Sequence, residues 1–223
     1  MRRYAPCRPG LLSRTVKILP TIDAMALTIE PLTPDRIPDP ATLFDQGGDP
    51  KWCWCAWFRV RGRDWTNATA VENRKLLQTA AQEQGHAPGL LAYEDDEVVG
   101  WVSLGPREDY ERLAFSKALA PLDEKPVWSI VCFVVGRKSR GQGNAAALLE
   151  AAIDYAREQG ATTLEAYPVD VPEGSRIPSA NAFHGTLAMF ERAGFNVVAR
   201  RKGTPMAKPR PIVRKTIRAT SRR

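Results

Sequence analysis

The stretch Val131-Cys-Phe-Val-Val-Gly-Arg-Lys-Ser-Arg-Gly-Gln-Gly-Asn-Ala-Ala-Ala-Leu-Leu149 decides the fold of this chain of 223 residues. Its first residues end an apolar, β-prone segment, 127–135, which predicts a central strand buried on both faces. Its last residues begin a segment, 144–159, whose apolar positions follow the 3.6-residue period of an amphipathic helix. Gly160 comes next, where a C-terminal capping glycine is common.

The turn between this strand and this helix has the features of an anion-binding site. The first N–H groups of a helix have no acceptor within it, and the helix dipole favours negative charge there. Gly141 and Gly143 let a phosphate approach the backbone, and Arg137 and Arg140 add positive charge. A P-loop is excluded because no Gly-Lys-Ser/Thr follows, and Gly-x-Gly-x-x-Gly of a Rossmann fold is absent. An ordinary turn with glycines for packing is the alternative.

The rest of the chain predicts an α/β fold with a mixed sheet. Two strand-like runs flank the polar turn 94–97 and predict a β-hairpin. The expected strands are Leu27–Leu32, Leu90–Tyr93, Val98–Leu104, Thr162–Tyr167, Phe195–Arg200 and Ile212–Ile217, and the expected helices are Asn67–Gln84, Ala182–Ala193 and a short patch within Asp109–Ala120.

The turn Arg140-Gly-Gln-Gly-Asn-Ala145 resembles motif A of the GNAT acetyltransferases, Gln/Arg-x-x-Gly-x-Gly/Ala. Two further segments are similar to that family: Leu164-Glu-Ala166 to its Leu-Glu-Val strand, and Met189-Phe-Glu-Arg-Ala-Gly-Phe195 to its aromatic-x-x-x-Gly-Phe helix end. Each motif is moderately specific, and their order along the chain is more so. The resemblance implies a mostly antiparallel sheet of six to seven strands with splayed central strands and flanking helices. It places the domain at 25–218, between a basic extension, 1–24, and a basic tail, 219–223.

The resemblance also implies an N-acetyltransferase that moves the acetyl group of acetyl-CoA to a primary amine of a small molecule, peptide or protein. Backbone amides of the motif would hold the pyrophosphate, and the preceding strand would offer backbone groups to the pantetheine and the acetyl carbonyl. The residues implied for acetyl-CoA binding are Phe133, Val134, Val135, Arg140, Gly141, Gln142, Gly143, Asn144 and Ala145.

Two residues are candidates for catalysis, Glu165 and His184. The tyrosine that often protonates the CoA thiolate in the family is replaced here by Phe190, so no general acid carries over. Glu165 matches the glutamate of the family's strand and is a hypothetical proton acceptor for the attacking amine. His184, near the start of the last helix, would lie close to the thioester. The alternatives are a solvated strand glutamate and a packing histidine.

The run Trp52-Cys-Trp-Cys-Ala-Trp-Phe58 falls where the family builds its acceptor site. It favours an aromatic acceptor pocket containing Trp52 and Trp54, with Tyr167 as a further lining residue. A Cys-x-Cys metal site is an alternative that lacks about two more ligands, so no metal is expected. Core packing is a third interpretation. The four cysteines of the chain are too few for a disulfide framework and are expected to be reduced.

The net charge of +7 is unevenly distributed. Residues 200–223 carry ten Lys/Arg and no acid, whereas 24–199 are net acidic, which weakly favours a cationic acceptor. Nucleic-acid binding through the basic ends is disfavoured because no base-stacking motif accompanies them. A sensor that binds acetyl-CoA without catalysis is the other competing function. No apolar run spans a membrane, so we expect a cytoplasmic protein that needs no membrane and that can form a homodimer.

Overall fold

A computed structural model describes residues 27–172, 183–206 and 209–218. The predicted extension 1–24 and tail 219–223 lie outside the described residues. The strands are β1 (Leu27–Pro31), β2 (Gly89–Glu94), β3 (Glu97–Pro106), β4 (Trp128–Val135), β5 (Thr163–Ala166), β6 (Asn196–Arg201) and β7 (Arg210–Thr216). The α-helices are α1 (Pro40–Phe44), α2 (Asp49–Cys53), α3 (Gly62–Asn67), α4 (Ala70–Glu83), α5 (Glu111–Phe115), α6 (Asn144–Glu158) and α7 (Leu187–Arg192).

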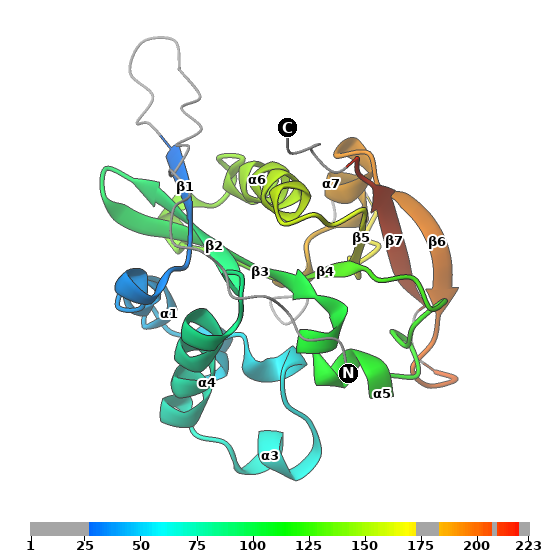
Figure 1. The fold of residues 1–223 in the computed structure, drawn as a ribbon, viewed down its shortest axis with the longest axis horizontal. Helices are drawn as coiled ribbons and strands as arrows, with labels where there is room; N and C mark the ends of the chain where they lie inside the picture. The colour runs from blue at the N-terminus through cyan, green and yellow to red at the C-terminus, as the bar shows by residue number, and fades with distance from the viewer. Residues whose placement is uncertain (1–26, 173–182, 207–208, 219–223) are drawn as a thin grey trace.

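The seven strands form one sheet in the order β1-β2-β3-β4-β5-β7-β6. Every neighbouring pair is antiparallel except β4 and β5, which are parallel. The mixed, mostly antiparallel α/β fold expected from the sequence is therefore confirmed. Figure 1 shows α6 and α7 on one side of this sheet and the short helices of the first half of the chain, with α4, on the other.

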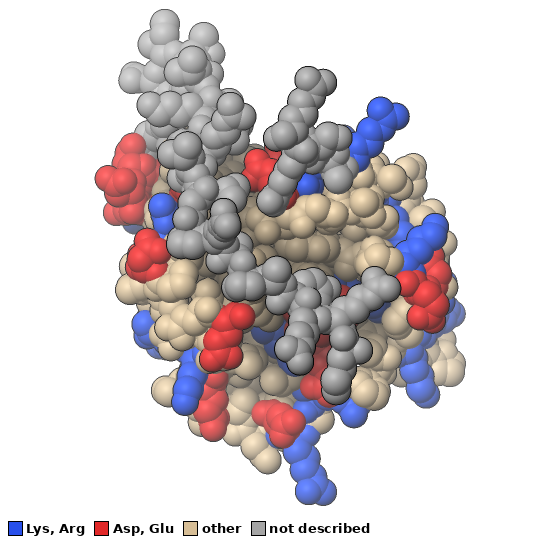
Figure 2. Space-filling view, viewed as in Figure 1, with Lys and Arg blue, Asp and Glu red and all other residues tan. Residues whose placement is uncertain are grey.

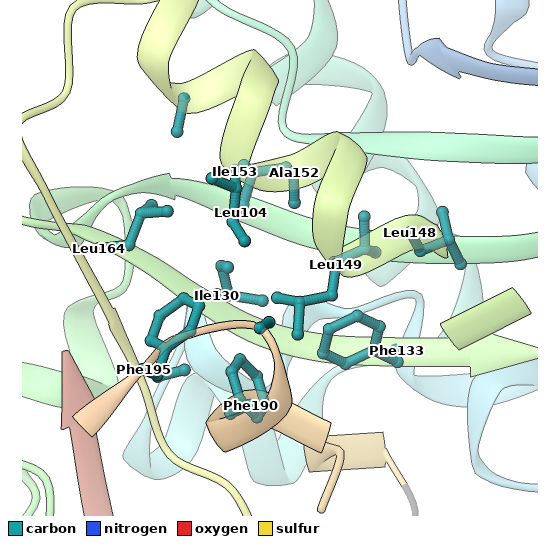
Figure 3. Packing of buried hydrophobic residues seen from close by; sticks show 14 of the residues in the cluster. Leu104, Ile130, Phe133, Leu148, Leu149, Ala152, Ile153, Leu164, Phe190 and Phe195 are labelled. Carbon is teal, nitrogen blue, oxygen red and sulfur yellow. The ribbon is translucent and has the colours of Figure 1, made fainter. Parts of the chain in front are cut away.

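The face of the sheet under α6 holds the largest apolar cluster. Residues of α6 point toward side chains of β3 and β4, and Phe190 of α7 packs between Phe133 and Phe195 (Figure 3). The fully or almost fully buried members from α6 are Leu148, Leu149, Ala152, Ile153 and Ala156. Their spacing is the one that the helical period predicts, so burial of this stripe fixes the helix to the sheet.

The opposite face is covered by aromatic side chains of the segment between β1 and β2. Phe44 of α1 makes edge contacts with Trp54 and Trp101, at ring-centroid distances of 5.0 and 6.1 Å. Trp101 of β3 is fully buried, and its indole N–H donates to the Cys55 sulfur at 3.0 Å. This layer places the tryptophan- and cysteine-rich run directly against the sheet.

The last helix is shorter than the sequence predicts. Instead of beginning near residue 182, α7 begins at Leu187, with Thr186 as its N-cap accepting a hydrogen bond from the Met189 N–H at 3.2 Å. Gly185 has a φ of 68°, a left-handed conformation that stops a helix from extending upstream. A parallel bridge between Val169 and Thr186 instead ties this segment to the chain that leaves β5.

Candidate functional site

The parallel strands β4 and β5 separate in the middle of the sheet. Their pairing ends at Ile130 opposite Ala166, although β4 continues to Val135. On the other side of β4, the partners jump from Ser103 opposite Cys132 to Leu104 opposite Ile130, so Val131 is the extra residue of a β-bulge. Within the described residues, the edge of β4 beyond Ile130 has no strand partner on the β5 side. Apart from the contacts of Val131 with His184 and of the Val135 carbonyl with Arg140, the described residues show no partner for this edge, which leaves backbone groups there for a ligand.

The glycine turn after β4 leaves a set of backbone amides unbonded. Gly143 is the N-cap of α6, with a φ of 87°, and Gly141 has a φ of 77°. A Cβ at either position would meet open space. In the described part of the chain, nothing accepts from the N–H groups of residues 141–145. With no acidic residue in the first turn of α6, these amides form a site for an anionic group.

The side chains of the turn point away from this group of amides. The Asn144 amide donates to Glu94 Oε1 at 2.9 Å and to the Ser139 carbonyl at 3.2 Å, which ties the start of α6 to the end of β2. Arg140 Nε donates to the Val135 carbonyl at 3.1 Å. The expected acetyl-CoA residues 133–135 and 140–145 lie at the end of β4 and in the turn that leads into α6. Phe133 is buried against Phe190, whereas Val134 lines the cavity side of the sheet. The Asn144 side chain is buried.

A cavity of about 590 Å³ lies against β4, lined by both β4 and the aromatic layer. A second cavity, of about 440 Å³, shares Trp57, Phe58, His184 and Arg210 with it. The lining of the first cavity also includes Val131, Cys132, Val134, Trp52, Trp65, Cys53, Cys55, Phe183 and Asp49. Because Val131 is the bulged residue, the cavity adjoins the point where β4 leaves β5.

Three tryptophans form one wall of the cavity. Trp65 makes edge contacts with Trp52 and Trp57, at centroid distances of 4.4 and 4.8 Å. The guanidinium of Arg112 lies 3.7 Å from the centre of the Trp57 ring and also donates to the Val60 carbonyl at 2.8 Å. The wall is therefore held by packing and by a cation–π contact.

The expected acceptor residues divide into one that lines the cavity and two that do not. Trp52 lies in the cavity wall, and its carbonyl accepts from Asn73 of α4 at 2.9 Å. Trp54 is buried in the core beside Phe44, with its indole N–H bonded to the Lys51 carbonyl. Tyr167 is buried beside Phe58 and Val131 without lining the cavity, and its hydroxyl donates to Glu165. The aromatic run lies at the cavity, but the sequence did not identify which of its rings line it.

The two catalytic candidates are not brought together. Glu165 is fully buried, and its Oε1 accepts from Arg107 and, at 2.7 Å, from the Tyr167 hydroxyl. Its Oε2 accepts from Arg214 Nε at 2.7 Å. Glu165 does not line the cavity, and both of its oxygens are already bonded, which favours a structural ion pair over proton transfer. Burial and the nearby Glu165 charge raise the pKa of Tyr167 well above its usual value.

His184 lines both cavities. Burial, and secondarily the positive charge of Arg210, lower its pKa to about 4, while a backbone interaction with Val131 opposes the shift. Its Nδ1 has no hydrogen-bond partner among the described residues. At neutral pH the ring is therefore uncharged and next to the bulge, and a neutral imidazole has one nitrogen that can accept a proton.

Sequence reasoning missed Arg210 and Trp65 as cavity residues. In the sequence, Arg210 is one of many basic residues in 200–223, and Trp65 lies outside the aromatic run 52–58. The Cys-x-Cys alternative finds no support in side-chain placement, since the described residues contain no group of three or more His, Cys, Asp or Glu arranged around a metal position. No helix in the described ranges is long and apolar enough to cross a membrane.

Much of the basic end is bonded within the protein. Arg200 pairs with Asp170, Arg201 donates to the Ala120 carbonyl at 2.9 Å, and Arg214 pairs with Glu165 and Asp123. Where described residues form the face seen in Figure 2, acidic and basic side chains are interspersed around its margin. These contacts give no support to a nucleic-acid surface built from this segment.

Comparisons with known proteins agree with this geometry. The model of the acetyltransferase (GNAT) family matches residues 54–195, more than half of the chain. Similar solved structures include a protein assigned to the GNAT family from Desulfovibrio desulfuricans, with 18% identity, a TM-score of 0.51 and coverage of 86% of this chain and 99% of that one. No curated protein sequence matches significantly.

Two other solved structures show the same fold. One, from Corynebacterium glutamicum, is described as histone acetyltransferase HPA2 and related acetyltransferase, with 20% identity, a TM-score of 0.51 and coverage of 88% of this chain and 99% of that one. An agmatine N-acetyltransferase has 10% identity, a TM-score of 0.53 and coverage of 86% and 99%. At these identities the likeness concerns the fold alone, but the family model, the split sheet and the glycine turn agree: the chain belongs to the GNAT acetyltransferase family.

Proposed function

We propose that the protein transfers the acetyl group of acetyl-CoA to a primary amine that enters the cavity beside Val131. The observation that carries this proposal is that the chain runs directly from the open edge of β4, whose bulge lines the cavity, into the turn with the unbonded amides of 141–145. The amides would hold the pyrophosphate, and the open edge of β4 would bind the pantetheine and position the thioester.

The proposed acetyl transfer needs few catalytic side chains. The amine nitrogen attacks the thioester carbon, a C–N bond forms, and the C–S bond breaks as the tetrahedral intermediate collapses. Free N–H groups on the edge of β4 are suited to stabilise the oxyanion. The nitrogen loses one proton, for which we propose His184 as the acceptor because His184 lines the cavity, whereas Glu165 does not. Phe190 has no proton to give, so water would protonate the CoA thiolate.

The binding of acetyl-CoA can be tested with two glycines that have almost the same backbone conformation. Gly143 and Gly160, at the two ends of α6, have φ values of 87° and 85°, and a Cβ at either one meets open space. Valine at either position therefore introduces similar strain, of roughly 1–2 kcal/mol. Only Gly143→Val places its side chain where the pyrophosphate would approach the amides.

Isothermal titration should show acetyl-CoA binding to Gly143→Val at least tenfold more weakly than to the wild type, with Gly160→Val unchanged. Equal affinity for both variants would remove the proposed pyrophosphate site. Release of free CoA in the presence of a panel of amines then separates the enzyme from a sensor, which would bind acetyl-CoA without turnover. The replacement of the family's tyrosine by Phe190 is the observation that favours the sensor.

A further inference from the structure

We infer that the acceptor is an amino acid with an apolar or aromatic side chain, whose carboxylate binds Arg210 while its amine lies near His184. The inference deepens the proposed function and rests on it. It assigns Arg210 as the residue that determines specificity and the tryptophan wall as the surface that binds the apolar part of the acceptor.

Arg210 is a half-buried cation that has no counter-ion among the described residues. It is the first residue of β7 and lines both cavities together with His184. Within the described ranges, no oxygen forms a hydrogen bond or ion pair with its guanidinium, and burial alone lowers its pKa. Neighbouring arginines differ, because Arg107 and Arg214 each hold carboxylate oxygens of Glu165. Arg210 is therefore placed to bind something other than the protein's own acids.

A guanidinium removed from water without a partner destabilises the protein, and a bound anion would offset that cost. Arginine presents a planar set of donors that matches a carboxylate with two parallel hydrogen bonds. The charge of Arg210 also reaches His184, whose pKa it lowers, so the two side chains lie close to each other. A ligand bound to both must carry its carboxylate and its amine a short distance apart, as an amino acid does.

Apart from Asp49, the rest of the cavity is lined by uncharged and mostly apolar residues. Its walls are dominated by Trp52, Trp57, Trp65, Phe44, Phe58 and Phe183, and burial raises the pKa of the Cys53 thiol to about 12. Asp49 is the lone carboxylate lining it among the described residues, and that side chain is exposed. A polyamine or another dication would find one exposed acid and a repelling Arg210. A single carboxylate on an apolar body fits better, and about 590 Å³ is large enough for it.

The same environment favours the reactive form of the amine. Desolvation and the positive charge of Arg210 both disfavour an ammonium ion in the cavity. An amino acid that enters with its carboxylate paired to Arg210 would lose its ammonium proton more readily than in water. Arg210 thus positions the acceptor and does not take part in bond making.

The test compares matched amines on the wild type. CoA release is measured with L-tryptophan and L-phenylalanine, with their amides, and with tryptamine and phenethylamine, which lack the carboxylate. The expected kcat/KM for each amino acid is at least tenfold higher than that for its amide or its decarboxylated amine. If kcat/KM of the wild type for tryptamine equals or exceeds that for tryptophan, the inference is overturned, although the proposed acetyl transfer would stand.

Variants then test whether Arg210 causes the preference for acceptors that carry a carboxylate. Arg210→Gln should lower the ratio of kcat/KM for L-tryptophan to kcat/KM for tryptamine at least tenfold, mainly through KM for the amino acid, and Arg210→Lys should be intermediate. Arg200→Gln is the control because Arg200 is exposed, pairs with Asp170 and lines neither cavity. An equal loss for acids and amines in Arg210→Gln would contradict the assignment.

A binding readout separates this inference from the proposed function. Titration of L-tryptophan into the CoA-saturated wild type should show binding that Arg210→Gln loses, whether or not turnover occurs. If no amino acid binds while tryptamine is acetylated, the inference fails and the function holds. If acetyl-CoA itself does not bind, the proposed function fails.

Discussion

Glu165 on β5 lies opposite Arg214 on β7, and the two side chains form an ion pair with 2.7 Å between Oε2 and Nε inside the protein, where Glu165 has no exposed surface. The other oxygen of Glu165 accepts from Arg107 just after β3. A residue that resembles a catalytic glutamate by sequence therefore joins three segments of the fold. Because both of its carboxylate oxygens accept from arginines, a substitution of Glu165 should lower the stability of the protein before it lowers the rate.

Replacing Glu165 with Gln should lower the free energy of unfolding by about 3 kcal/mol, since it leaves two arginines without their buried counter-ion. Urea denaturation measures this loss. Glu150→Gln on the exposed face of α6 is the control and should change stability by less than about 0.5 kcal/mol. If folded Glu165→Gln instead shows a normal stability and a shifted pH–rate profile, Glu165 is the proton acceptor after all.

His184 should make the protein less stable in mild acid. Its pKa is about 4 in the folded protein against an ordinary 6.5, so between these values the unfolded chain binds a proton that the native protein does not. Stability should therefore fall as the pH drops from about 6.5 to about 4, by roughly 2–3 kcal/mol in total, and level off below. The difference in unfolding free energy between the wild type and His184→Asn, measured across this range, isolates the effect. A difference that does not vary with pH would show that His184 titrates normally.

The thiols beside the cavity should be unreactive in the native state. Burial raises the pKa of Cys53 to about 12, with the neighbouring Cys55 as a smaller cause, and interaction with Cys55 and burial raise that of Cys132 as well. Because the thiolate is the nucleophile, Cys53 should react with a disulfide reagent at pH 7 about a thousandfold more slowly than a free thiol. The experiment uses the Cys7→Ser variant, because Cys7 lies outside the described residues. The labelling rate of this variant in its native state is compared with its labelling rate in denaturant. Rapid labelling of native Cys53 would contradict this environment.

Phe190 should act as a packing residue and not as a lost catalytic position. It is fully buried, with ring centroids 6.0 Å from Phe133 and 5.1 Å from Phe195. Phe190→Ala should cost about 3–5 kcal/mol of stability, and Val71→Ala on the exposed face of α4 is a control with little effect. Phe190→Tyr should not raise turnover. A gain of tenfold or more in that variant would mean that protonation of the CoA thiolate limits the wild type.

The elements proposed to bind acetyl-CoA could be predicted because their sequence signals are local. The apolar run 127–135 and the periodic segment 144–159 correspond to β4 and α6 within one residue at each end. Gly141 and Gly143 have the left-handed conformations that their place in the turn suggests. A strand, a turn and a helix that follow one another depend on neighbouring residues, so the order of amino acids specifies them directly.

The aromatic run shows where local signals end. Trp54 and Cys55 have φ values of 45° and 56°, which no periodicity in the sequence announces. These left-handed residues turn the Trp54 ring into the core, while Trp52 and Trp57 remain at the cavity. The composition of the run therefore predicts an acceptor region. The direction in which each ring points depends on the backbone conformation of Trp54 and Cys55.

Residues within single short segments were enough to identify the family, the strand–turn–helix proposed to bind the pyrophosphate, and the lack of a proton donor at Phe190. The tertiary structure decided which titratable groups are available. Arg107 and Arg214 enclose Glu165 from separate strands, whereas Val131, His184 and Arg210 meet at the cavity from three distant parts of the chain. Charge and pKa depend on which groups are brought together out of water, and only the folded chain sets those distances.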